Sequence, residues 1–259
     1  MALTTEFLAQ AQSEIESVCR HYQPILIEAA GKIEHEIKGD DTPVTALDLE
    51  IEHALKDTLY KLDPGIGFEG EEHGKEGNEN TFWLIDPIDG TESFIRGLPA
   101  YRNMVTLIDN DEAVFALVIN VATNEKFLAT KGLGAYCNDQ KLQVSSRPLK
   151  RSWIELAGYT ALPDVTKLMT AVRKEVRGVR VTGDFRYTPM GQFDGHLSFA
   201  PSGHAWDFAP WTLLIAEAGG KVMNIGSDTY NYRNGNFLAS NPVIFDDLLK
   251  IINETVDKH

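Results

Sequence analysis

The chain has 259 residues, of which 43% are hydrophobic and 24% charged, so it can bury a full core and is not a disordered protein. Asp and Glu number 38 against 24 Lys and Arg, and the formal charge of −14 argues against a DNA- or RNA-binding surface. There is no apolar run of about 18 residues, and with only Cys19 and Cys137 there is no disulfide framework. The opening residues carry acids in place of a basic and then an apolar region, so we expect no signal peptide. We therefore expect a cytoplasmic protein without a membrane span, whose cysteines pack in the core.

In the first half of the chain, the spacing of apolar residues predicts helices over 6–37, with Pro24 marking a kink or a new first turn, and over 45–62. Short apolar and β-branched runs then predict strands at 66–69, 82–85, 104–108 and 113–121. The segment Asp109-Asn110-Asp111-Glu112 predicts a turn between the last two strands. This half reads as helices packed on a sheet with antiparallel pairs.

The second half alternates between the two kinds of element, which is typical of a layered α/β arrangement. The expected elements are a strand at 153–157, a helix at 165–176, a strand at 179–182, a helix at 208–218, strands near 221 and 237, and a helix from 243. No flexible linker marks a boundary. We place the division near 148, by Arg147-Pro148, and expect two halves, 1–148 with most of the metal ligands and 149–259 with Asp207 and the substrate contacts.

The most informative segment is Trp83–Phe94, in which an apolar strand runs into Asp86 and Asp89 and is followed by glycine and threonine. Because proline and glycine favour a turn, the two carboxylates can converge on one point, where the Ile88 carbonyl can also act as a ligand. Ligands that are all oxygen favour Mg²⁺, Mn²⁺ or Ca²⁺ over zinc. Taken alone, however, an Asp-Gly-Thr segment is an ordinary turn.

Two further acidic groups are candidates for the same site. Glu71 lies in an acidic cluster after a predicted strand, and Asp207 lies where an N-cap is expected before an apolar helix. Each also has a purely structural explanation. The glutamate can belong to a solvated surface, and Asp207 can be a helix cap without a ligand role. If both join Asp86 and Asp89, each pair of charges about 4 Å apart costs about 4 kcal/mol at an effective dielectric constant near 20. Such a cluster requires bound cations or partial protonation.

Two other interpretations of the aspartates fail on spacing. An EF-hand calcium loop starting at Asp86 needs an acidic third residue and a glutamate at the twelfth position, where this chain has Ile88 and Gly97. Aspartic proteases pair two aspartates, usually in the order Asp-Thr-Gly, whereas this chain has Asp-Gly-Thr once.

Three motifs together resemble the inositol monophosphatase family of Mg²⁺-dependent, lithium-sensitive phosphatases. They are Gly70-Glu71-Glu72, Trp83–Phe94 (WLIDPIDGTESF), and Trp206-Asp207 followed by Glu217-Ala218-Gly219-Gly220. Their order and spacing match the family over residues 38–220 or so. The resemblance implies a mixed α+β or α/β fold, the layered αβαβα sandwich of the sugar-phosphatase type, and a homodimer.

The resemblance also implies a set of metal ligands. Glu71, Asp86 and the Ile88 carbonyl would bind one Mg²⁺, and Asp86, Asp89 and Asp207 would bind a second, so that Asp86 bridges the two ions. Two divalent ions about 3.5 to 4 Å apart can stabilise both the attacking and the leaving oxygen of an in-line displacement at phosphorus. The expected cofactor is therefore Mg²⁺, with two or three ions in each site.

Other residues are assigned by the same resemblance. Thr91, together with Glu71, would orient the attacking water, and the backbone amides of Gly90 and Thr91 would hold the phosphate. Amides at a turn that leads into a helix attract anions, which is an independent reason for this assignment. Asp89 and Asp207 would also face the substrate.

The upstream segment Lys38–Asp48 resembles the family as well, in particular its bacterial members and the relatives that hydrolyse 3′-phosphoadenosine 5′-phosphate. By this match Asp48 or Asp40 helps to hold a weaker third ion through water, and Thr45 supports the loop. The alternative is a mobile polar loop that leads into a capped helix. A loop of this kind can close over a substrate.

The substrate is where the resemblance weakens. The segment His196–Ala205, just before Trp206-Asp207, lacks the acidic residue that inositol-specific members have there. Gly183–Tyr187 replaces their Gly-Ser-Ala-Ala segment. Arg186 is a candidate for a second anionic group of the substrate, and His196 or His204 for a polar leaving group. The alternatives are a surface arginine and loop histidines with structural roles.

From these residues we expect a phosphoric monoester hydrolase that acts on a small phosphorylated alcohol, such as an inositol phosphate-like compound, histidinol phosphate or a sugar phosphate. The alternatives are 3′-phosphoadenosine 5′-phosphate or fructose 1,6-bisphosphate as substrate, or an interaction protein of the same fold. A purely binding protein has no need of four converging acids. No nucleic acid or membrane partner is expected.

Overall fold

The computed structural model describes residues 3–158, 163–199 and 203–255. The chain forms two compact units, Met1–Leu128 and Ala129–His259. The boundary expected at 148 therefore falls inside the second unit, and the functional division into halves at that point stays a prediction. Among the described residues, no helix is both long and apolar enough to cross a membrane.

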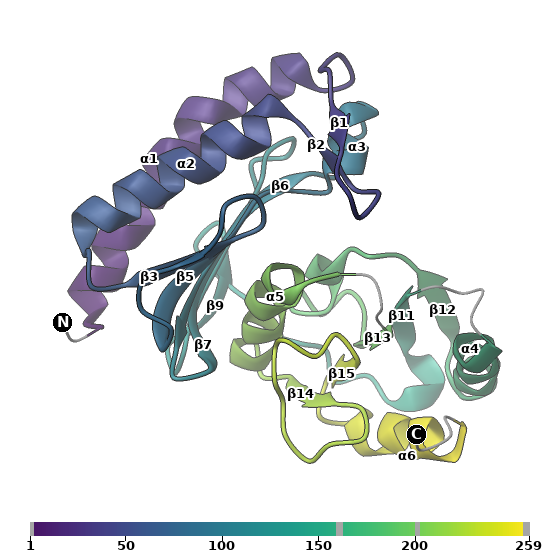
Figure 1. Cartoon of the computed structure of the whole chain (residues 1–259). Helices are drawn as coiled ribbons and strands as arrows, with labels where there is room; N and C mark the ends of the chain where they lie inside the picture. The colour runs from purple at the N-terminus through teal and green to yellow at the C-terminus, as the bar shows by residue number, and fades with distance from the viewer. Residues whose placement is uncertain (1–2, 159–162, 200–202, 256–259) are drawn as a thin grey trace. The chain divides into compact units, whose positions relative to one another are not determined.

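Two long helices build one layer of the first unit, and Figure 1 shows them side by side. Helix α1 (Thr5–Ala29) begins at Thr4, whose hydroxyl accepts a hydrogen bond from the Phe7 amide at 3.2 Å. Helix α2 (Ala46–Leu62) covers the predicted range almost residue for residue. The first helix was predicted to reach residue 37, which is wrong. It ends at Ala29, because Gly31 takes a positive φ of 74° at a position where a Cβ would lie 3.1 Å from the Gly97 Cα.

The sheet of the first unit carries the segments that matter for function. In this eight-stranded sheet, five strands run in the order β4-β3-β5-β6-β7, and among these five only the β3–β5 pair is parallel. They are β3 (Gly67–Gly70), β4 (Gly74–Glu76), β5 (Thr81–Asp89), β6 (Arg102–Asp109) and β7 (Glu112–Asn120). The predicted turn between the last two is confirmed, with Asn110 and Asp111 at positive φ as two-residue hairpins require.

Small elements connect these layers. They are the antiparallel pair β1 (Glu36–Ile37) and β2 (Pro43–Val44) and the short helix α3 (Thr91–Ile95). Strand β8 (Lys126–Thr130) spans the division between the units and lies next to β7 in the sheet. The core lies between α1, α2 and the sheet, where the Trp83 ring packs edge-on against Phe115 at 6.1 Å and against Phe7 at 6.5 Å.

The second unit is a sheet with helices on both faces. Its five strands run in the order β12-β11-β13-β15-β14, parallel among the first three and antiparallel among the last three. They are β11 (Trp153–Gly158), β12 (Gly178–Val181), β13 (Gly195–Phe199), β14 (Lys221–Asn224) and β15 (Phe237–Ser240). The predicted mixed α+β class is thereby confirmed.

Helices α4 (Pro163–Glu175) and α6 (Phe245–Thr255) pack on the face that carries Leu197 and Leu238. Helix α5 (Ala205–Glu217) packs on the opposite face, where its Phe208 meets Phe237 at 5.5 Å. The unit also contains the hairpin β9 (Gly134–Cys137) and β10 (Gln140–Lys141), and the 3₁₀ turns η1 (Leu149–Arg151) and η2 (Phe185–Tyr187).

Candidate active site

The parallel pairing of β3 and β5 brings Glu71 beside Asp86. Gly70 pairs with Ile85, and the Glu71 amide, one residue beyond the strand, donates to the Ile85 carbonyl at 3.2 Å. The carboxyl ends of parallel strands meet at one edge of a sheet, so acids that follow the two strands share this edge. Glu71, one residue beyond the end of β3, therefore lies beside Asp86 of β5.

Asp86 and Asp89 converge through a bulge, which corrects the predicted turn. Strand β5 does not end at Ile85 but continues to Asp89, and its pairing shifts between Asp86, opposite Met104, and Asp89, opposite Arg102. The bulge holds Pro87, which has no amide to pair. As a result the two aspartates each offer a carboxylate oxygen, and these oxygens lie within 4.8 Å of each other. Asp86 is buried and Asp89 is partly exposed.

Gly90 and Thr91 follow at the start of α3. Gly90 has φ of 84°, and a Cβ there would lie 2.4 Å from the Ala100 carbonyl oxygen, so only glycine fits this turn. The Thr91 hydroxyl is buried, within hydrogen-bond distance of the Ile88 carbonyl (2.9 Å) and of Asp48 Oδ1 (3.2 Å). The structure thus links Thr91 to two of the other predicted site residues.

Asp48 is fully buried at the start of α2, where it closes a capping box with Thr45. Its Oδ2 accepts from the Thr45 amide at 2.8 Å and from the Thr45 hydroxyl at 2.5 Å. Burial raises the pKa of the Asp48 carboxyl above its ordinary value, although the Thr45 hydrogen bonds act in the opposite direction. Asp40, the alternative in this segment, is exposed and accepts from the amide and hydroxyl of Thr42.

Lys38 is a site residue to which the sequence interpretation gave no role. Its ammonium group donates to Glu71 Oε1 at 2.8 Å and to Glu72 Oε1 at 3.0 Å. Burial would lower the Lys38 pKa, but the hydrogen bonds and charges of the two glutamates outweigh it and raise that pKa above the ordinary value. Only its place in the Lys38–Asp48 segment hinted at this role. Lys38 therefore partly neutralises the acidic cluster.

Two more charged residues complete the surroundings in the first unit. Arg102, on β6, pairs with Asp89 through its Nε at 2.9 Å. Glu52, on α2, is completely buried and accepts hydrogen bonds from the residues after Glu71. Neither had been singled out from the sequence, because an arginine in a strand and a glutamate in a helix carry no motif of their own.

Asp207 belongs to the second unit, and the expectation that it is the N-cap of its helix is wrong. The N-cap of α5 is His204, and Asp207 is the third helical residue. It reaches back so that its Oδ2 accepts from the His204 amide at 2.5 Å. Its role as a ligand, together with Asp86 and Asp89, stays a prediction.

The candidate substrate residues of the second unit differ in accessibility. Arg186, in η2, is held by Asp184 at 3.0 Å and lies over the Tyr187 ring. His204 is exposed and stacks on Trp206 at 4.7 Å. His196 is completely buried in β13, a strand not predicted from the sequence, so it is not a loop histidine and cannot reach a leaving group.

The chemistry of the donor set fits a divalent cation. Glu71, Asp86 and Asp89 are carboxylates and the Ile88 group is a carbonyl, so all the donors are hard oxygens of the kind that Mg²⁺ prefers. Two partly or fully buried carboxylates whose oxygens lie within 4.8 Å repel each other strongly in the absence of a cation. The geometry therefore suits a site for positive charge and for the phosphate that such a charge attracts.

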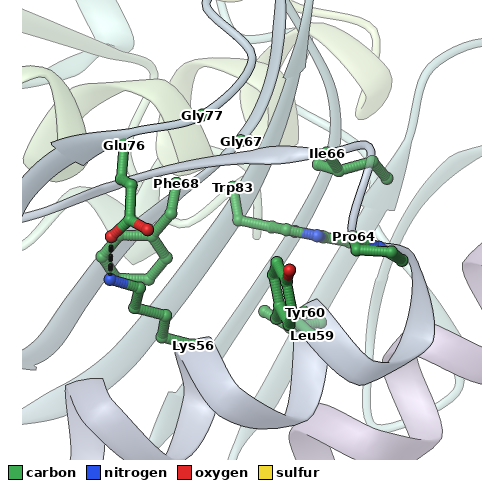
Figure 2. A pocket seen from close by; sticks show the side chains of 10 residues that line it. All are labelled: Lys56, Leu59, Tyr60, Pro64, Ile66, Gly67, Phe68, Glu76, Gly77 and Trp83. Carbon is green, nitrogen blue, oxygen red and sulfur yellow. Dashed lines mark hydrogen bonds and ion pairs between the residues drawn. The ribbon is translucent and has the colours of Figure 1, made fainter.

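A hollow of the first unit, away from the acidic cluster, has a different chemical character. Figure 2 shows it between the end of α2 and the β3–β4 hairpin. It is lined by Lys56, Leu59, Tyr60, Pro64, Ile66, Gly67, Phe68, Glu76, Gly77 and Trp83. Within this lining, Glu76 is the one carboxylate, and it forms an ion pair with Lys56. The hollow has no convergent oxygen donors and does not compete with the strand-end cluster as the catalytic site.

Comparison with known proteins identifies the family of the chain. The model of the inositol monophosphatase family matches residues 3–257. The fructose-1,6-bisphosphatase/inositol-1-monophosphatase of Thermotoga maritima is 31% identical over 221 residues, covering 83% of this chain and 84% of that protein. The histidinol-phosphatase of Mycobacterium tuberculosis is 29% identical over 230 residues, covering 83% of this chain and 86% of that protein.

A solved structure supports the fold over nearly the whole chain. A Thermotoga maritima IMPase superposes with a TM-score of 0.83 at 27% identity, covering 95% of this chain and 98% of that one. The match to the family model, over residues 3–257, includes every motif on which the resemblance was based. The chain therefore belongs to the inositol monophosphatase family of phosphoric monoester hydrolases.

Proposed function

We propose that this phosphatase hydrolyses a small phosphorylated alcohol, either an inositol phosphate-like compound, histidinol phosphate or a sugar phosphate, with two or three Mg²⁺ ions in the site. The observation that carries the proposal is the arrangement at the ends of β3 and β5. There, parallel pairing and a bulge gather Glu71, Asp86 and Asp89 at one edge of the sheet. Family membership supports the same ligand set.

The residues divide between two ions. Glu71, Asp86 and the Ile88 carbonyl would hold one Mg²⁺, and Asp86, Asp89 and Asp207 would hold the second. Asp48 would contribute to a third, weaker ion through water. When bound, the ions polarise the phosphate and make a coordinated water more acidic.

The chain's own groups then position the reactants. Thr91 has one hydroxyl proton, which its two neighbouring acceptors, Ile88 O and Asp48 Oδ1, compete for. Its oxygen lone pairs remain able to accept a hydrogen bond from the attacking water, and Glu71 would orient that water from the other side. The backbone amides of Gly90 and Thr91 would donate to the phosphate oxygens.

Substrate choice would depend on the second unit. Arg186, held in place by Asp184 and Tyr187, would meet a second anionic group, and exposed His204 would contact a polar leaving group. The alternatives are 3′-phosphoadenosine 5′-phosphate and fructose 1,6-bisphosphate, both of which carry a second phosphate.

A panel of phosphate monoesters, compared by kcat/KM at fixed Mg²⁺ with a parallel lithium series, separates these substrates. A loss confined to bisphosphates in Arg186→Gln would assign that side chain to the second phosphate.

The central experiment measures phosphate release with and without Mg²⁺. We expect release to depend on Mg²⁺ and to be abolished in Asp86→Asn and in Asp207→Asn, with circular dichroism unchanged. Asp246→Asn, whose side chain is 84% exposed on α6, is the matched control and should keep full activity. Metal-independent release, or full activity in both site variants, would refute the proposal and leave an interaction protein of this fold as the alternative.

Two properties are proposed from the family alone. The chain would form a homodimer and act in the cytoplasm on a soluble substrate. Sedimentation equilibrium tests the first, and a single monomeric species at micromolar concentration would contradict it.

A further inference from the structure

Glu52 is a buried carboxylate to which none of the proposed chemistry gives a role. It lies on α2 one turn after Asp48, with no exposed surface. Its Oε2 accepts from the Glu72 amide at 3.0 Å, and its Oε1 accepts from the His73 amide and from His73 Nδ1, both at 2.7 Å. A buried carboxylate is costly unless it is well hydrogen-bonded, and these three donors supply that need.

The donors come from the two residues that directly follow Glu71. The Glu71 amide is itself bonded to the Ile85 carbonyl of β5. The backbone is therefore tied to the sheet at Glu71 and to α2 immediately afterwards, which fixes the direction in which the Glu71 side chain leaves the chain. Without Glu52, the amides of Glu72 and His73 would lose their acceptor and the turn its second anchor.

Gly70 shows how closely the carboxylate approaches this turn. A Cβ at Gly70 would lie 2.5 Å from the Glu52 Cδ and 2.6 Å from both carboxylate oxygens. Real Cβ atoms do not approach other atoms this closely, so a side chain at position 70 would displace Glu52. The glycine of the Gly70-Glu71-Glu72 motif thus leaves room for the α2 carboxylate as well as ending the strand.

We propose that Glu52 is a positioning residue that aims Glu71 at the metal by holding the two backbone amides after it. The inference rests on the proposed function, because the role of Glu71 as a metal ligand is itself part of that proposal. Glu52 acts through the backbone and does not itself touch metal or substrate. Groups behind a metal ligand typically change metal affinity by about 10- to 100-fold when they are removed.

The test is Glu52→Gln, which keeps the size of the side chain but turns an NH₂ group toward one of the backbone amides. Glu50→Gln is the matched control, since Glu50 lies on the same helix with an exposed side chain that accepts from Tyr22. Mg²⁺ affinity is measured by calorimetry, and hydrogen exchange reports on the Glu72 and His73 amides. We expect Glu52→Gln to lower the affinity about 10-fold or more and to speed exchange at both amides, while Glu50→Gln changes neither.

A purely structural role predicts a different result, namely a lower unfolding midpoint with unchanged Mg²⁺ affinity in the folded fraction. That outcome overturns the inference. If Glu52→Gln does not fold, Gly70→Ala disturbs the same contact from the other side and should give the same loss of affinity. Unchanged affinity in Gly70→Ala would count equally against it.

Glu71→Gln distinguishes the two levels of the proposal. If Glu71→Gln leaves Mg²⁺ affinity unchanged, the ligand set under the proposed function fails. If Glu71→Gln weakens binding but Glu52→Gln does not, the positioning role alone fails. At saturating Mg²⁺, we further expect kcat of Glu52→Gln to recover toward the wild-type value while the concentration of Mg²⁺ needed for half-activity stays raised.

Discussion

Glu155 and His196 put two polar side chains inside the second unit. Both are completely buried on neighbouring strands, with Glu155 Oε2 3.3 Å from His196 Nδ1. Within the described residues, Glu155 Oε1 and His196 Nε2 have no hydrogen-bond partner. The imidazole stacks on the Phe185 ring at 4.0 Å. The pair thus links strands β11 and β13 to η2. Burying it costs desolvation free energy, which its hydrogen bonding only partly offsets.

His196→Phe tests how far each member depends on the other. Phenylalanine keeps the ring stacking but removes the partner of Glu155, and breaking a buried pair in this way costs about 3 kcal/mol or more. Urea denaturation should show this loss in the free energy of unfolding. The double variant His196→Phe/Glu155→Leu replaces both polar members of the pair with apolar side chains, and it should recover most of the lost free energy of unfolding. A single variant as stable as wild type would contradict the expectation.

Cys19 provides a test of burial in α1. Burial, assisted by the charge of Glu16, raises the pKa of the Cys19 thiol from 9.0 to about 12. At pH 9 about one thiol in a thousand is then ionised in the folded state, against about half in the unfolded chain. In a Cys137→Ser variant, which leaves Cys19 as the one thiol, iodoacetamide should therefore label the protein slowly at pH 9. Urea should restore rapid labelling, and fast labelling of the folded protein would show that the site is open to reagent.

At the scale of elements, the turn between β5 and α3 depends on Gly90. Alanine there would have to hold φ near 84° with its Cβ 2.4 Å from the Ala100 carbonyl oxygen. The conformation alone costs about 1 kcal/mol or more for a residue with a side chain, and the clash would displace the backbone between Asp89 and Thr91. We expect Gly90→Ala to lower both the unfolding free energy and phosphate release.

Gly226→Ala is the matched control for this prediction. Gly226 has a similar φ of 81°, but nothing lies within 4 Å of its added Cβ. It should show the conformational cost without the clash, and activity should stay near that of wild type. If both variants lost activity equally, the effect at Gly90 would have to be global destabilisation and not a displaced site.

Elements with a strong local pattern could be predicted from the sequence, and those defined by distant pairing could not. Helix α2 has regular apolar spacing and a clear cap, and its predicted bounds are confirmed. Strand β13 was missed because it is short and holds the polar His196 and Ser198, which are buried by neighbouring strands and not by their own character. The end of β5 was placed too early because Pro87 reads as a turn, whereas a bulge accommodates it.

The candidate site shows the same division. Motif spacing predicts Glu71, Asp86 and Asp89 as ligands because metal chemistry restricts both residue type and order, and the assignment stays a prediction. Lys38 and Glu52 contribute through contacts with the turn at Glu71, and those contacts depend on how α2 and the β1–β2 hairpin pack. No local sequence pattern marks a residue that acts only by contacting another site residue or the backbone next to it.

At the scale of the whole molecule, the formal charge of −14 bears on stability as well as on partners. Self-repulsion among acids destabilises a compact state, and the repulsion is strongest where carboxylates are gathered. Bound Mg²⁺ would reverse the local sign at the strand-end cluster, which is how an acidic protein can take a phosphorylated substrate.

Mg²⁺ should therefore stabilise the folded chain more than general screening does. A ligand at about 100 times its Kd adds about 2.7 kcal/mol to the unfolding free energy, which corresponds to a rise in Tm of about 5 °C or more for a chain of this length. Thermal unfolding in EDTA, in MgCl₂ and in NaCl of equal ionic strength separates specific binding from screening. We expect the Mg²⁺ increment to disappear in Asp86→Asn, which in NaCl should unfold at the wild-type temperature or above it, because one of the two repelling carboxylates is gone. Equal shifts in NaCl and MgCl₂ would mean that the acidic cluster is only screened and holds no ion.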